Sequence, residues 1–233
     1  MRGSRRFVLI SGAGYAVPTF DGSYSLFGDA KKGYIELYTS GTLTFSTSAT
    51  VDIFAVGGGK NGSSGGLYYY SGDGGKAGAN FTLLKHKLSS GEYTITIASA
   101  TGNTSFGDIQ TTSATGVGTP GAGVGTEGSF ATKNGIRGSN GGYPFGDSTF
   151  SRVQGTGGSG GIQQGTGGAG GAGGGGAGGD GGISGTSRNG KAGTANTGGG
   201  GGGAGNSGGN HGTGGSGGSG LIIVRWGDWS DAA

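Results

Sequence analysis

The chain has 233 residues, of which 68 are glycine, 3 are proline and none is cysteine. Glycine averages about 7% in proteins, so this composition excludes an ordinary globular domain, while the few prolines exclude collagen and the missing cysteines exclude a disulfide framework or thiolate metal site. The net charge of +3 comes from scattered lysines and arginines, which argues against nucleic-acid binding, and no apolar run approaches the ~20 residues of a membrane span.

Residues 1–40 are predicted to form an N-terminal arm or attachment segment with short strands. Apolar pieces at 7–10, 15–20 and 24–27 are separated by glycine and proline. The opening residues match an expression leader at 1–4 and a twin-arginine export signal at 4–7. The apolar run after the arginines is too short for a signal peptide, so we favour a native strand or attachment segment.

Alternating apolar residues predict the strands of a small β core. Residues 34–38 and 42–46 are expected to pair as a hairpin that turns at Ser40 and Gly41. No segment has a convincing helical period, so the predicted fold is all-β with essentially no α-helix. The further expected strands are 51–56, 80–84, 93–97, 103–108 and 221–226.

Glycine-rich segments interrupt these strands. The first, residues 57–78, contains three adjacent tyrosines, which cannot all face one interior because successive strand residues point to opposite sides. Residues 112–148 carry apolar residues singly among Gly, Thr and Ser, and we interpret them as loops and short glycine rods.

The tract 198–220 has a strict period of three. From Ala204 onward every third position is a non-glycine residue, namely Ala204, Ser207, Asn210, Thr213, Ser216 and Ser219, and the same phase recurs in 156–162, 166–172 and 177–183. A helix repeats near 3.6 and a strand at 2, so this spacing predicts the extended three-residue helix, here polyglycine II. The segments are expected to pack as a bundle of rods.

A Gly-Gly-X rod has two ridges without side chains, so neighbours can approach on two sides and bond through the backbone. The all-glycine pieces 198–203 and 173–176 can be surrounded, and the stretch from Ala204 to Ser219 would make one rod of roughly 50 Å. The alternative is a flexible or disordered linker. The sustained phase and the apolar strand that follows at 221–226 count against that alternative.

The order of these features resembles the glycine-rich domain of bacteriophage tail-fibre tip proteins and adhesins. The resemblance covers roughly 40–226 and implies a small β-sandwich or jelly-roll-like core with polyglycine II rods, whose joining loops recognise a receptor. Some receptor tyrosine kinases have a similar extracellular domain, which the lack of cysteine disfavours. The tyrosine triplet departs from the family pattern. The matching segments are 41–45, 50–59, 88–97, 103–108 and 218–226, and the expected division is 1–40 arm, 41–226 glycine-rich domain and 227–233 C-terminal tail.

No catalytic, metal or cofactor motif emerges. His86 and His211 lie far apart, the carboxylates stand singly, and Gly-x-Gly-x-x-Gly matches carry no information at this glycine content. We therefore expect a non-enzymatic protein without cofactors. Trp226 and Trp229 are expected to close the core or an oligomer contact. Aromatic platforms and polar contacts for a receptor are predicted at Tyr68, Tyr69, Tyr70, Arg137, Tyr143, Phe145, Arg188, Asn189, Asn210 and His211. The alternative for the aromatic residues is that they seal the glycine rods against the β core.

The resemblance implies a virion protein at a tail or fibre tip, which binds a host glycan or an outer-membrane or cell-wall component and attaches to other virion proteins through its N-terminal arm. Either a homotrimer or a monomer capping a trimeric fibre is expected, with neither nucleic-acid binding nor membrane insertion. One alternative is a structural head-fibre or decoration protein without receptor binding. Another is an ice-binding protein, for which the outward residues are poorly regular.

Overall fold

The computed structural model describes residues 17–66, 71–111, 145, 166–181, 188–207 and 210–229, and these residues form an all-β structure without α-helix. Two five-stranded antiparallel sheets make up the β core, and a two-stranded ribbon lies apart from them. The strands are β1 (Thr19–Phe20), β2 (Tyr24–Gly28), β3 (Gly33–Leu37), β4 (Gly41–Phe45), β5 (Ala49–Val56), β6 (Asn80–Leu88), β7 (Gly91–Thr96), β8 (Ser105–Phe106), β9 (Ile109–Gln110), β10 (Asn206–Ser207), β11 (Asn210–His211) and β12 (Leu221–Trp226).

The two sheets share one hydrophobic core. One sheet has the order β1-β4-β7-β8-β9 and the other the order β2-β3-β12-β5-β6. Alternate residues of each strand point inward, so Leu43 and Ile95 from the first sheet meet Ile35, Ile53 and Ile222 from the second. All five side chains are at most 1% exposed. The predicted strands at 34–38, 42–46, 51–56, 80–84, 93–97 and 221–226 are confirmed to within a few residues.

The predicted hairpin between β3 and β4 is wrong, because these two strands belong to different sheets. Strand β3 already has β2 on one side and β12 on the other, which leaves no free edge for β4. The chain crosses between the sheets over three residues. Tyr38 N still donates to Ser23 O beside β2, whereas Ser40 Oγ accepts a hydrogen bond from Ile97 N just after β7.

The described part of the predicted N-terminal arm belongs to both sheets. Strand β1 pairs with β4 and strand β3 pairs with β12, and Ile35 and Leu37 of β3 are fully buried. Residues 17–40 and the strands that follow therefore share a single core. The short strand expected at 103–108 is instead a tight hairpin of β8 and β9, which turns at Gly107 with a φ of 55°.

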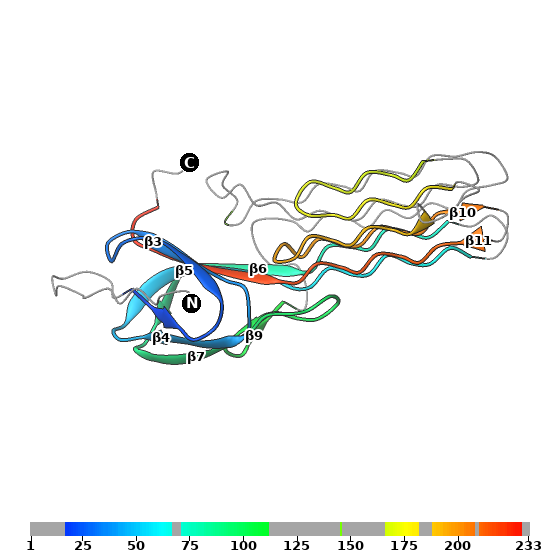
Figure 1. Ribbon diagram of the computed structural model, residues 1–233. Coiled ribbons are helices and arrows are strands. Elements are labelled where there is room, and N and C mark those ends of the chain that lie inside the picture. The colour runs from blue at the N-terminus through cyan, green and yellow to red at the C-terminus, as the bar shows by residue number, and fades with distance from the viewer. Residues whose placement is uncertain are drawn as a thin grey trace, which may run out of the picture.

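A glycine slab extends from one end of the β core (Figure 1). We use this name for residues 57–66, 71–79, 166–181, 188–207 and 210–220. The slab begins where β5 and β12 adjoin glycine. Val56, the last residue of β5, is followed by Gly57, and Gly220 immediately precedes β12. Backbone hydrogen bonds continue across the junction, including Gly57 N to Ala79 O and Gly59 N to Gly218 O.

The central segment of the slab, residues 199–203, meets neighbours in a three-residue cycle. A Cβ at Gly199 or Gly202 would come closer than 3.0 Å to the backbone of residues 174–177, and one at Gly200 or Gly203 would collide with residues 72–75. A Cβ at Gly201 would meet Gly215 O. Successive residues of 199–203 therefore face different neighbouring segments in turn, and none of these positions has room for a side chain.

Backbone hydrogen bonds join this central segment to further neighbours. Gly201 N donates to Lys60 O (2.9 Å) and Gly202 N donates to Lys191 O (2.8 Å), while Gly176 N donates to Gly200 O (2.9 Å). All the residues of 198–203 are buried, as the all-glycine composition predicted. The period of three also governs the outer segment 212–218, where Gly212, Gly215 and Gly218 are buried and the intervening Thr213 and Ser216 are exposed.

Two details of the rods differ from the sequence prediction. The piece 173–176 is not surrounded throughout, because the chain turns there and Gly173 and Gly174 have φ values of 99° and 96°. The single rod expected from Ala204 to Ser219 is divided by a reversal at β10 and β11, where Asn206 pairs with His211.

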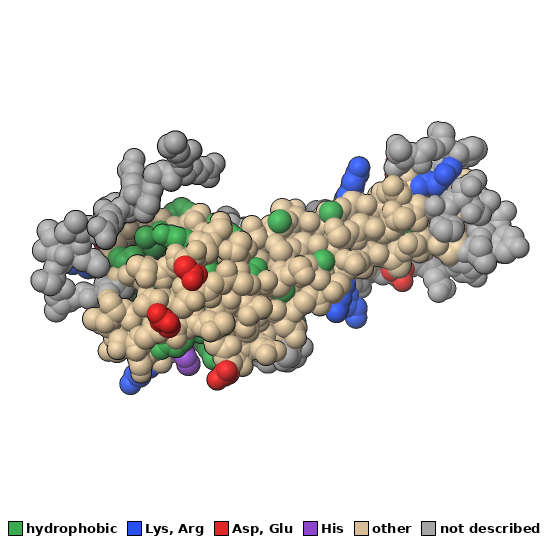
Figure 2. All heavy atoms as spheres, turned by 60° about the horizontal axis from the view of Figure 1, so that its bottom comes forward, with side chains coloured by type: hydrophobic (Ala, Val, Ile, Leu, Met, Phe, Trp, Pro, Cys, Tyr) green, Lys and Arg blue, Asp and Glu red, His purple; other side chains and the backbone are tan. Residues whose placement is uncertain are grey.

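The surfaces of the slab and of the β core differ in composition. Figure 2 shows that the visible face of the slab is mostly backbone and small polar groups, while apolar side chains gather on the β core.

Candidate functional site

The end of the slab farthest from the β core is a place where several segments meet (Figure 1). Strands β10 and β11 form their antiparallel ribbon there. Beside it, Gly205 N donates to Arg188 O (2.8 Å) and Gly212 N donates to Gly205 O (3.1 Å). The segments around residues 188, 205 and 212 are thus joined to one another at this end.

Polar side chains hold this end together by bonding to the backbone of other segments. Asn206 Nδ2 donates to Gly66 O (2.7 Å), and Gly167 N donates to Asp180 Oδ1 (2.7 Å). Thr213 N donates to Asn189 Oδ1 (2.9 Å). These polar side chains therefore connect neighbouring segments at the end of the slab by hydrogen bonds. The connections make the surface that carries the joining loops rigid.

Four of the predicted receptor-binding residues lie at this end. Arg188 and Asn189 begin one slab segment, and Asn210 and His211 form β11. The tyrosine triplet, Tyr68 to Tyr70, lies outside the described residues, as do Arg137 and Tyr143. The described residues that flank the triplet belong to the same end, because Gly66 O accepts a bond from Asn206 and Gly72 N donates to Ala204 O.

Phe145, a predicted aromatic platform, lies buried against the β core and not on the end of the slab. Its ring packs edge-on against Phe54 at a centroid distance of 6.2 Å, and the Arg225 guanidinium lies 4.0 Å from its centroid. With 6% of its surface exposed, the ring is not available as an open platform. The ring therefore covers part of the outer face of the core, beside Phe54 and Arg225.

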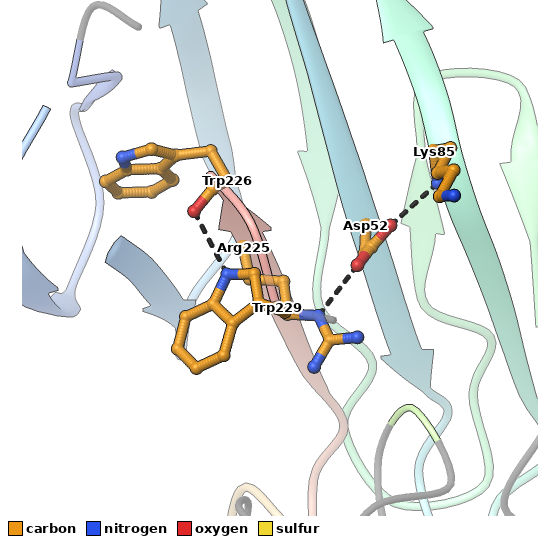
Figure 3. Close-up of polar contacts among 5 residues, drawn as sticks. All are labelled: Asp52, Lys85, Arg225, Trp226 and Trp229. Carbon is orange, nitrogen blue, oxygen red and sulfur yellow. Dashed lines mark hydrogen bonds and ion pairs between the residues drawn. The ribbon is translucent and has the colours of Figure 1, made fainter. Parts of the chain in front are cut away.

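A hollow of about 430 Å³ lies on the same face of the core. Its central feature is an ion pair in which Arg225 Nε donates to Asp52 Oδ2 (2.8 Å), with side-chain exposures of 7% and 17%. Asp52 Oδ1 also accepts a bond from Lys85 N (2.7 Å), as Figure 3 shows. The lining residues are Thr50, Val51, Asp52, Leu84, Lys85, Arg225, Gly227, Asp228 and Trp229.

The backbone around the hollow is shaped to make this ion pair. The register of β5 against β6 shifts between Val51 and Ile53, and Lys85 opposite has a positive φ of 52°, which turns its N–H toward the Asp52 carboxylate. Both carboxylate oxygens are engaged by the protein. We interpret the pair as a clamp that ties β12 and β5 to the edge strand β6.

The sequence analysis missed this pair, although a signal for it was present. Asp52 and Arg225 each interrupt an otherwise apolar strand, and a lone charge in such a strand needs a partner when it is buried. The two tryptophans differ in burial: Trp226 belongs to the core between the sheets, whereas Trp229 is half-buried and lines the hollow. Trp226 is buried and donates from Nε1 to Asp29 O (2.8 Å), and Trp229 donates from Nε1 to Trp226 O (3.0 Å).

Among the described residues, no cluster of three or more His, Asp or Glu is placed to hold a metal ion. A helix with the length and apolarity to cross a membrane is likewise not found in the described ranges. Comparison with known proteins finds neither a family model nor a curated protein that matches this sequence.

Proposed function

We propose that this protein is a non-enzymatic virion component, a phage tail-fibre tip or receptor-binding adhesin, which recognises the host cell surface at the far end of the glycine slab. In this proposal the slab is a bundle of polyglycine II rods on a jelly-roll-like core. The three-residue cycle of neighbours around 199–203 supports the rods, since a three-fold helix presents three equivalent ridges. The receptor is a glycan or an outer-membrane or cell-wall component.

The observation that carries the proposal is the position of the candidate residues. Arg188, Asn189, Asn210 and His211 come together at a braced end remote from the core, although the last two lie more than twenty residues from the first two (Figure 1). Loops on a rigid scaffold can vary without disturbing the segments that support them. A glycine bundle provides such a scaffold, because its packing depends on backbone and not on side chains.

The test is binding of the labelled, purified protein to a panel of bacterial surfaces, with competition against phage adsorption. Selective binding that blocks adsorption is the expected result. The combined variant Tyr68→Ala, Tyr69→Ala and Tyr70→Ala is expected to weaken binding at least tenfold, since stacked aromatic anchors often carry more than about 1.4 kcal/mol. Leu84→Ala, an exposed position on the core strand β6, is the matched control and should bind as the parent does.

A folded protein that binds no surface and leaves adsorption untouched would overturn the proposal. Imaging of labelled virions then separates the alternative function. Copies at a tail or fibre tip agree with an adhesin, whereas copies distributed over the capsid would identify a structural head-fibre or decoration protein.

A further inference from the structure

The edges of the two core sheets are not equally protected. Strands β1 and β9, at the edges of one sheet, have only two residues each. Strand β6, at one edge of the other sheet, carries Lys85, His86 and Lys87, and Lys85 interrupts the strand with a positive φ. Short length, charge and irregularity are the devices by which natural sheets prevent edge-to-edge pairing.

Strand β2, at the remaining edge, is longer than β1 and β9 and has no charged residue. Its five residues, Tyr24–Gly28, pair with β3 without a bulge, and only the last of them, Gly28, has a positive φ, of 82°. Tyr24, Leu26 and Phe27 are 40–43% exposed, which makes them three of the four large apolar side chains recorded as exposed among the described residues. An exposed apolar edge strand of this kind is a template for another strand.

The hydrogen-bonding alternation shows which backbone groups of β2 face outward. Ser23 O accepts from Tyr38 N, and Asp29 N donates to Lys32 O, so the odd-numbered residues bond toward β3. The N–H and C=O groups of Tyr24, Leu26 and Gly28 therefore point away from β3. No described strand pairs with β2 on that side.

We propose that β2 pairs with β2 of a second copy of this chain, antiparallel and about a two-fold axis at Leu26. In this register Leu26 lies opposite Leu26 of the second copy, and Tyr24 lies opposite Gly28. All the outward-facing residues then form hydrogen-bonded pairs. This one register therefore pairs the outward N–H and C=O groups of β2 in both copies. The interface is isologous, the commonest type in homo-oligomers. It differs from both assemblies that the resemblance implies, a homotrimer and a monomer that caps a trimeric fibre.

Side chains favour the same register. Leu26 and Tyr24 lie opposite Ile35 and Leu37 of β3, so they continue the apolar face of the sheet out to its edge. Pairing would place the Leu26 and Tyr24 side chains of both copies on this one face, with each Tyr24 ring over the bare Gly28 of the other copy.

Charge favours the antiparallel direction. Asp21 precedes β2, and its exposed carboxylate accepts a hydrogen bond from Thr42 N (2.6 Å). The turn that follows β2 carries one acidic residue, Asp29, whose carboxylate accepts bonds from Lys31 N and Lys32 N, and two basic residues, Lys31 and Lys32, so the turn is basic on balance. An antiparallel pair brings the acidic start of each strand toward the basic turn of the other copy, whereas a parallel pair would place like charges together.

The first test is sedimentation of the full-length protein over a range of concentrations. We expect a reversible dimer in the parent, and at least a tenfold weaker association for Leu26→Lys, because the lysines would face each other across the axis. Leu84→Lys makes the same change at an exposed leucine of the opposite edge strand, β6, and should associate as the parent does. Circular dichroism confirms that both variants fold.

Disulfide formation tests the register, since the chain has no cysteine of its own. In Leu26→Cys the two Cα atoms would lie about 5.5 Å apart, within disulfide range, so a covalent dimer should form on oxidation. In Tyr24→Cys the equivalent residues would be offset by four positions, roughly 13 Å, and should not cross-link. Cross-linking of Tyr24→Cys in preference to Leu26→Cys would overturn the proposed register.

Three other results would overturn the proposal as a whole. A parent that stays monomeric while Leu26→Cys fails to cross-link would show that β2 does not self-pair. Equal association of Leu26→Lys and the parent would place the interface elsewhere. An intramolecular disulfide in Leu9→Cys with Leu26→Cys would assign the edge to the apolar segment 7–10 of the same chain. None of these results depends on whether the protein binds a cell surface.

Discussion

The β core and the glycine slab are built from some of the same chain segments but by opposite packing rules. Strands β5 and β12 run side by side in the core and continue as neighbouring segments of the slab. In the core, side chains such as Ile53 and Ile222 fill the space between two sheets. In the slab, the backbone of residues 199–203 contacts other backbone on every side. The difference begins where side chains end, at Gly57 and Gly220.

The comparison shows that the two regions draw stability from different sources. Burying a large aliphatic side chain contributes about 1.5–3 kcal/mol, and the core collects many such contributions. The slab has few apolar side chains, so it depends on backbone hydrogen bonds worth about 0.5–1.5 kcal/mol each. Glycine also loses the most conformational freedom on folding. The slab therefore needs nearly every backbone group to be paired, which explains its dense bonding between segments.

The largest effect is expected from adding one methyl group to the centre of the slab. In Gly201→Ala the new Cβ would overlap Gly215 O, which is backbone and cannot rotate away. We expect a loss of about 3 kcal/mol or more, because overpacking commonly costs 1–3 kcal/mol even where side chains can adjust. Hydrogen exchange should show lost protection across the neighbouring slab segments, including residues 59–63 and 212–218.

Ser216→Ala is the control for that variant. Ser216 is an exposed residue of the outer segment 212–218. It stands at the position of the three-residue cycle that is not buried against a neighbouring segment. Its stability should change by less than about 0.5 kcal/mol. Equal tolerance of Gly201→Ala and Ser216→Ala would refute the account of backbone packing given above.

In the β core the opposite change is expected to destabilise the protein: a smaller buried side chain, not a larger one, should lower the free energy of unfolding. Ile222 is fully buried between the two sheets. Ile222→Ala should lower the free energy of unfolding by about 2–5 kcal/mol, and Ile222→Val by about 0.5–1.5 kcal/mol, as measured by chemical denaturation. A graded loss is expected because the cavity grows with each methyl group removed. A cost for Ile222→Val as large as that for Ile222→Ala would argue against a cavity-dominated core.

A smaller effect is expected from breaking the clamp between β12, β5 and β6. Asp52→Asn keeps the shape but removes the charge that faces Arg225 and bonds to Lys85 N. We expect a loss of about 1.5–3 kcal/mol, the range for hydrogen bonds to charged groups. Asp108→Asn, at an exposed carboxylate in the β8–β9 turn, is the control. A neutral Asp52→Asn would show that the pair contributes no net stability to the core.

The smallest effect is expected from protonation of Asp29 at low pH. Backbone hydrogen bonds from Lys31 and Lys32 lower the pKa of Asp29 below its ordinary value of 3.8. A lowered pKa in the folded state stabilises the protein above pH 3.8, and this contribution is lost as the pH falls through the folded-state value. The difference in melting temperature between the parent and Asp29→Asn should therefore shrink below pH 3.8. A difference that stays constant with pH would contradict the role of the charge.

The sequence predicted the burial of 198–203 because the signal is local. An all-glycine run requires no knowledge of neighbours, and it predicted that this piece can be surrounded, as its burial confirms. Where the chain turns was harder to predict. The reversal at β10 and β11 coincides with Asn206 and His211, two residues that depart from the Gly-Gly-X pattern, but the pattern does not say that the chain turns there. It is fixed by bonds such as Asn206 to Gly66, across a separation of 140 residues.

The candidate site was predicted in part, for the same reason. Polar residues within the rods, such as Asn189 and Asn210, follow from the sequence as departures from glycine, and the fold places them at one end. Phe145 was predicted as a binding residue in the same way, yet its ring is buried beside Arg225. A single aromatic residue in a glycine-rich loop does not reveal which surface it meets.

The sequence by itself determined the class of structure, the positions of most strands and the places where side chains are excluded, because these depend on patterns of two and three residues along the chain. The tertiary structure alone decided the order of the described strands in each sheet, the pairing of Arg225 with Asp52 and the position of β2 at the edge of its sheet. Each of these depends on which segments become neighbours, and that is settled by long-range packing and by the backbone groups left to be paired.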